Sequence, residues 1–117
     1  MVDEVVVLNV EAGKVYFKIK CADGVSLATS APFPTICRLE AALQTLASAA
    51  KQGWELSDGP SGSLVKVGRR QVPLQEHLSL EAVSAVLQTV TAARIVDARP
   101  ASRRRYDLSG LRCDLTR

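Results

Sequence analysis

One stretch in the first third of the chain alternates hydrophobic and polar residues with the two-residue period of a β-strand. The alternation runs over residues 15–21, and its outward positions are Tyr16, Lys18 and Lys20. Asp23-Gly24 follows, a pair that tolerates positive φ and favours a hairpin, so residues 25–29 are predicted to return as a second strand. A run of β-branched residues at 5–10 predicts another strand ahead of these two. The three strands are expected in meander order.

Two segments carry the three- and four-residue spacing of amphipathic helices. In the first, the hydrophobic stripe consists of Ile36, Leu39, Leu43, Leu46 and Ala50. Thr35 is suited to cap the N-terminus of this helix, and Gly53 its C-terminus. In the second, the stripe consists of Leu80, Val83, Leu87 and Val90, with Ser79 as the expected cap. Arg99-Pro100 is predicted to end the second helix.

Together these segments predict an α+β domain over residues 1–98, an antiparallel sheet packed by two amphipathic helices. Residues 54–56 and 64–67 flank a Gly- and Ser-rich turn, so the second half repeats the strand–turn–strand–helix order of the first. Leu39-Glu40-Ala41 is also echoed by Leu80-Glu81-Ala82. The pattern is consistent with two tandem ββα-type units, about 1–53 and 54–98. The repeated letters have two alternative explanations, a true duplication or chance.

Charge is distributed unevenly along the 117 residues. The formal net charge is +3, yet residues 91–117 alone hold seven arginines against three aspartates. These arginines are Arg94, Arg99, Arg103, Arg104, Arg105, Arg112 and Arg117. Residues 99–117 thus form an arginine-rich C-terminal tail. Its hydrophobic positions alternate with polar ones from Tyr106 to Leu115, which is typical of a terminal strand that could pair with an edge of its own sheet or of a second chain.

The N-terminal sequence points to a cytoplasmic protein. The hydrophobic run at 5–10 is too short to cross a bilayer, and acidic Asp3 and Glu4 precede it where a signal peptide would be basic. We therefore expect a cytoplasmic location and no membrane partner.

No pattern in the sequence predicts catalysis, a cofactor or a metal. The three cysteines and the single histidine have no zinc spacing and no disulfide framework. Cys21 is in phase with the inward side chains of its strand and is expected in the core, and His77 is expected to be an exposed loop residue. The glycines at 59–62 lack the Lys-Ser/Thr ending and the following helix of a phosphate-binding loop. We therefore expect no catalytic residues, no cofactor and no enzymatic activity.

The segment Phe17-Lys18-Ile19-Lys20-Cys21-Ala22-Asp23-Gly24-Val25-Ser26-Leu27-Ala28-Thr29-Ser30 resembles the repeat of the YegP-like family of small uncharacterised bacterial proteins. The shared pattern is an aromatic, alternating strand residues, a turn, a hydrophobic strand, and a further aromatic at Phe33 before a helix. Pro34-Thr35 stands where the family has a Ser-Lys pair. The resemblance covers about residues 14–50. It implies a fold built from such units and a bacterial source, and it implies no activity.

The function expected from the sequence is that of a small non-enzymatic protein-interaction module, of the adaptor, immunity or inhibitor type. It would act by surface binding or by self-association as a homodimer. The expected partner-binding residues are Arg103, Arg104, Arg105, Tyr106 and Arg112, and the expected sheet-face contacts are Tyr16, Lys18 and Lys20. The alternative is a nucleic-acid-binding accessory protein, because clustered arginines beside a tyrosine suit phosphates and bases.

Overall fold

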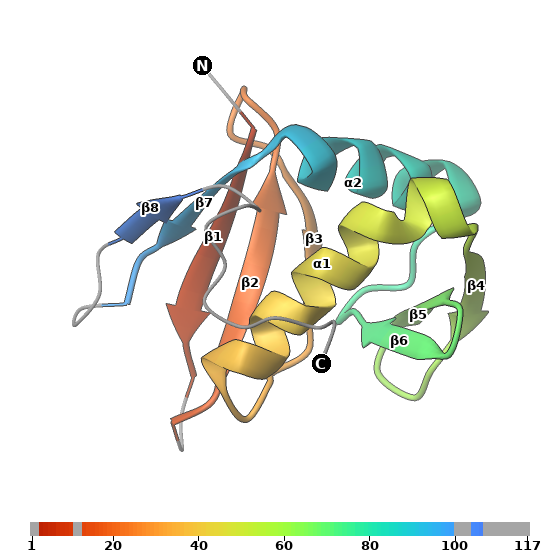
Figure 1. Cartoon of the computed structure of the whole chain (residues 1–117), viewed down its shortest axis with the longest axis horizontal. Coiled ribbons are helices and arrows are strands. Elements are labelled where there is room, and N and C mark those ends of the chain that lie inside the picture. The colour runs from red at the N-terminus through yellow and green to blue at the C-terminus, as the bar shows by residue number, and fades with distance from the viewer. Residues whose placement is uncertain (1–2, 11–12, 100–103, 107–117) are drawn as a thin grey trace.

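A computed structural model describes residues 3–10, 13–99 and 104–106 (Figure 1). The first three strands are β1 (Glu4–Asn9), β2 (Val15–Lys20) and β3 (Ser26–Thr29), followed by helix α1 (Ile36–Gln52). Three more strands are β4 (Glu55–Asp58), β5 (Ser63–Val67) and β6 (Arg70–Pro73), followed by helix α2 (Leu80–Ala92). The last two strands are β7 (Arg94–Asp97) and β8 (Arg104–Tyr106). This is the α+β fold expected from the sequence.

The strands form two separate sheets, where the sequence predicted one antiparallel sheet. The larger sheet has the order β3-β2-β1-β7-β8, and the smaller has the order β4-β5-β6. All pairings are antiparallel except that of β1 with β7, which is parallel. A parallel pair needs a long crossover, and here the chain from β1 to β7 includes both helices. The expectation of a single antiparallel sheet was wrong because β7, the parallel partner of β1, lies about ninety residues away in the sequence, where local periodicity carries no information on pairing.

The hydrophobic core lies between the inner face of the larger sheet and the two helices. Val5, Val7, Phe17 and Ile19 point inward from β1 and β2 and are fully buried. Helix α2 contacts β1, β2 and β3, whereas α1 contacts α2, β2, β5 and β6. Figure 1 shows the larger sheet at the left and the smaller sheet at the right, with the helices extending between them. Helix α1 therefore joins the two sheets through one core.

Both helices begin where the sequence predicts, and α1 also ends there. The expected end of the second helix at Arg99-Pro100 was wrong, because α2 ends at Ala92 and residues 94–97 form strand β7. The Thr35 hydroxyl accepts a hydrogen bond from the Arg38 N–H at 3.2 Å, and the Ser79 hydroxyl accepts one from the Ala82 N–H at 3.1 Å. Gly53 has a φ of 80° and donates its N–H to the Ala49 carbonyl at 2.8 Å. These caps satisfy backbone groups that the helix ends leave without an intrahelical partner.

The segment that follows β6 closes the edge of β3 and joins the two sheets. The Ala31 N–H donates to the Pro73 carbonyl at 3.0 Å, and the Gln75 N–H donates to the Thr29 carbonyl at 2.9 Å. The Glu76 carboxylate completes the closure by accepting the Thr29 N–H at 2.9 Å. An exposed strand edge is a template for pairing with another chain, and this contact removes that template along the second half of β3.

Gly62 lies where two backbone segments meet in the turn between β4 and β5. A Cβ atom built on Gly62 would overlap the Leu74 carbonyl oxygen and lie 2.7 Å from the Gln75 carbonyl carbon. The Ser63 N–H beside it donates to the Glu76 carbonyl at 2.8 Å. The glycine at this position is thus explained by backbone crowding.

We expect Gly62→Ala to destabilise the fold by about 1–3 kcal/mol, because the added methyl group must push apart two hydrogen-bonded backbone segments. Chemical denaturation of the full chain measures the change. Ser61→Ala at the exposed neighbouring position is the control and should stay within about 0.5 kcal/mol of the wild type. An equal stability of Gly62→Ala and Ser61→Ala would contradict the crowding.

Candidate functional site

The larger sheet has an outer face on the side away from the helices. On β2, Tyr16, Lys18 and Lys20 alternate with buried residues and are half-buried. Both helices lie on the opposite, inner side of the sheet (Figure 1). Within the described part of the chain, the outer side chains therefore pack mainly against one another.

One row of side chains crosses all five strands on this outer face. Residues directly opposite each other on neighbouring strands share a face, so the register defines the row as Thr29, Lys18, Val6, Val96 and Arg105. Lys18 and Arg105 are three strands apart, roughly 14 Å at the usual strand spacing. The row is hydrophobic at its centre and basic toward both sides.

Neighbouring rows extend the same pattern. Lys20, Glu4 and Arg94 are aligned across β2, β1 and β7, and Tyr16 is aligned with Leu8. We define the outer sheet face as Glu4, Val6, Leu8, Tyr16, Lys18, Lys20, Thr29, Arg94, Val96 and Arg105. It holds four cationic side chains and one carboxylate around a patch of Val, Leu and Tyr.

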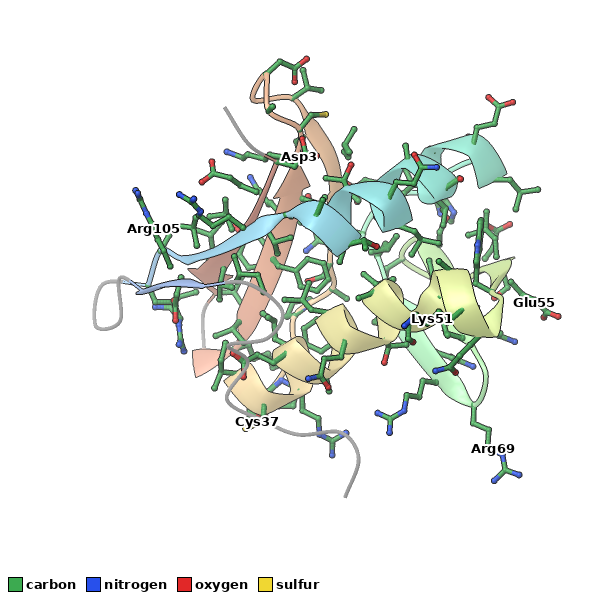
Figure 2. All side chains as sticks on the ribbon, turned by 45° about the horizontal axis from the view of Figure 1, so that its top comes forward. Asp3, Cys37, Lys51, Glu55, Arg69 and Arg105 are labelled. Atoms are coloured by element: carbon green, nitrogen blue, oxygen red, sulfur yellow. The ribbon has the colours of Figure 1, made fainter. Side chains whose placement is uncertain are left out.

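The structure brings together residues that the sequence assigned to two separate sites. Strand β8 pairs antiparallel with β7, so Arg105 lies on the same face as Tyr16, Lys18 and Lys20. Arg105 is exposed, and Figure 2 shows it at the left side of the molecule. Arg104 and Tyr106 also belong to β8. Arg103, Arg112 and the predicted strand positions from 107 to 115 lie outside the described residues.

The sequence missed six of the ten outer-face residues, which are Glu4, Val6, Leu8, Thr29, Arg94 and Val96. The continuous hydrophobic run at 5–8 conceals the alternation of β1, which shows only in its burial pattern. Arg94 is one of the seven arginines counted in residues 91–117, and the sequence predicted no strand around it. The signal that could have found it is the pattern Arg94-Ile95-Val96 directly after the second helix.

Arg99 faces a different environment from the other arginines. Asp97 points to the inner side of β7 and is buried, and its carboxylate accepts hydrogen bonds from the Arg99 side chain at 2.6 and 2.8 Å. A charge-assisted pair with two parallel bonds holds the guanidinium in place. Arg99 therefore belongs to the end of the core and not to the outer sheet face.

The other groups that the sequence singled out include His77 and the cysteines. His77 lies 3.5 Å from Asp58, and both side chains are mostly exposed. In residues 3–10, 13–99 and 104–106, no group of three or more His, Cys, Asp or Glu side chains could hold a metal. Cys37 is disulfide-bonded, so the expectation of no disulfide was wrong, because the spacing of cysteines along a chain does not show which thiols the fold brings together. No helix within the described ranges has the length and hydrophobicity needed to cross a membrane.

Cys21 has a free thiol at the end of the β2–β3 hairpin. It is half-buried and follows β2, so the expectation of a core position was wrong. Desolvation raises the pKa of the thiol, and the charge of Asp23 and a hydrogen bond to it raise this pKa further. The Asp23 carboxylate also accepts the Val25 N–H at 3.1 Å and so shapes the predicted turn.

The fold and the outer sheet face define a small α+β protein with one basic, partly hydrophobic sheet surface. No protein-family model matches the sequence, and neither does any of the curated proteins searched. Among solved structures, the chain is similar to YegP from E. coli, a protein of unknown function, with a TM-score of 0.62 at 12% identity. The match covers 87% of this chain and 97% of YegP. The YegP-like resemblance of the sequence is thereby confirmed at the level of the fold.

We expect Cys21 to be alkylated by iodoacetamide more slowly at pH 8 than a cysteine in an unstructured peptide, because a raised pKa lowers the fraction of reactive thiolate. Asp23→Asn removes the negative charge but keeps a turn-forming side chain, so it should shift the midpoint of the pH–rate curve downward. Peptide mass spectrometry measures the rate at Cys21 itself. Asp58→Asn at the exposed end of β4 is the matched control, and an equal shift in both variants would contradict the assigned cause.

Proposed function

We propose that this chain is a non-enzymatic binding protein whose outer sheet face docks on an acidic surface of another protein. The observation that carries the proposal is the composition of this face, in which Lys18, Lys20, Arg94 and Arg105 surround Val6, Leu8 and Val96. A hydrophobic centre with a polar rim is the usual anatomy of a protein–protein interface. The cationic rim would select a partner of opposite charge and speed its association.

The dimensions of the face support this role. Five strands at the usual spacing span roughly 19 Å, and a six-residue strand is roughly 20 Å long. The projected area is therefore roughly 400 Å², whereas a stable interface buries about 800 Å² of accessible surface on each partner. The outer sheet face is large enough to form the centre of such an interface, with adjacent loops completing it.

Charge also distinguishes the possible partners. Two copies stacked through this face would bring Lys18, Lys20 and Arg105 against the same cations of the partner, which costs free energy. Self-association, which the sequence also predicts, would have to use another surface. The face carries a single aromatic residue, Tyr16, whereas single-stranded nucleic acids bind on several stacked aromatics. An acidic protein thus fits the face better than either alternative. The cytoplasmic location and bacterial source stay predictions.

Affinity capture from an extract of the source organism, carried out with and without nuclease treatment, tests the proposal. The test variant is Lys18→Glu/Arg105→Glu, which reverses two charges on the outer sheet face. The control is Lys51→Glu/Arg69→Glu, which makes the same change in net charge on exposed residues far from Arg105 (Figure 2). We expect the wild type and the control to capture one acidic protein, and the test variant to bind the purified protein at least about tenfold more weakly.

Two results would contradict the proposal. If the control loses the partner and the test variant keeps it, the interface lies on the side of α1 and the smaller sheet. If the captured material is nucleic acid and disappears after nuclease treatment, the arginine-rich tail is acting as a nucleic-acid-binding segment, which is the alternative function. A steep loss of binding with added salt would accompany the second result.

A further inference from the structure

A groove separates helix α1 from strand β6 on the side of the molecule away from the outer sheet face. It consists of two hollows of about 360 and 250 Å³. Thr45 and Arg70 line both hollows, so the two form one elongated depression. A total of this size falls in the range of sites for small molecules.

Among the described residues, three arginines line this groove and no carboxylate does. Arg69 and Arg70 lie beside the larger hollow, and Arg38 lies beside the smaller one. All three residues are exposed, and within the described ranges no carboxylate forms an ion pair with any of them. The remaining polar lining is provided by amides and hydroxyls, among them Gln44, Gln52 and Gln71. The part of the groove lining that the structure describes therefore offers cationic and neutral hydrogen-bonding groups and no negative charge.

The fold fixes the position of these arginines. Gly68 has a φ of 63° in the tight turn between β5 and β6, and Val67 pairs with Arg70 to close that turn. The turn lies close to the end of α1, where a Cβ atom on Gly68 would be 3.6 Å from the Gln52 side-chain oxygen. Arg70 is two residues from buried Val72 and so points to the same side of β6, toward α1.

The start of α1 adds a second source of positive potential. The first turn of this helix contains no acidic residue, so no side chain of that turn offsets its partial positive charge. Pro34 and Arg38 bring this end of the helix into the smaller hollow. Phe33 supplies a hydrophobic wall beside them.

From these observations we infer that the groove between α1 and β6 binds a small phosphorylated molecule. A guanidinium group presents a planar fork of donors that matches two phosphate oxygens, and three such groups can hold one or two phosphates. Phe33 and Pro34 would contact the non-phosphate part of the ligand. The site is separate from the outer sheet face. The chain would therefore bind a small molecule in the groove as well as the proposed protein partner on the sheet.

Amide NMR of the full-length protein tests this site, with inorganic pyrophosphate as the probe at constant ionic strength. We expect saturable shifts at Arg38, Thr45 and Arg70 and none on the outer sheet face. Arg70→Gln should weaken binding about tenfold or more, because charge-assisted hydrogen bonds are lost. Arg105→Gln makes the same charge change on the outer sheet face and should leave the affinity unchanged. If Arg70→Gln does not fold, Arg38→Gln serves as the test variant.

Four results would overturn the inference. Shifts that do not saturate, or an equal loss in Arg105→Gln, would mean that the probe responds only to the overall charge. Malonate binding as tightly as pyrophosphate would mean that the groove recognises carboxylates. Tighter binding of a poly-glutamate peptide in the same groove would assign it to an acidic protein segment in place of a small molecule.

Discussion

The backbone contact between residues 29–31 and residues 73–76 is the constraint on which the rest of the structure depends. It joins two sheets that have no strand pairing in common, through two backbone hydrogen bonds and the bond from Thr29 to the Glu76 carboxylate. Buried backbone groups must be paired, and here a loop and a side chain supply partners that a sixth strand would otherwise provide. The same contact holds β6 beside α1, so the arginine groove depends on it as well.

Closing the β3 edge also determines which surfaces remain for binding. The inner face is covered by the helices and one edge is blocked, which leaves the outer sheet face as the broad surface of the larger sheet. Its charges come from strands far apart in the sequence, since Lys18 lies on β2 and Arg105 on β8. Strand β7 pairs in parallel with β1 and carries β8 on its other side, and Arg105 on β8 completes the basic row. The proposed function thus follows from topology more than from any single motif.

Local features of the fold could be predicted from the sequence because local chemistry determines them. Thr35, Ser79 and Gly53 identify the helix ends, and Asp23-Gly24 identifies the first hairpin. The division into two sheets and the parallel β1–β7 pair could not be predicted, because strand pairing across ninety residues has no local period. The candidate site divides in the same way. The alternation around Lys18 is local, whereas its alignment with Arg105 and the groove around Arg70 are products of tertiary packing.

Hydroxyl-radical footprinting of the free full-length chain tests most directly whether the outer sheet face is available to a partner. Tyr16 on this face and Phe17 in the core are neighbours in sequence, and Phe17 is 0% exposed. We expect oxidation at Tyr16, protection at Phe17, and loss of the Tyr16 signal when the captured partner is added, with half-buried Trp54 unchanged as the internal reference. Equal protection of Tyr16 and Phe17 in the free chain would contradict an open binding face.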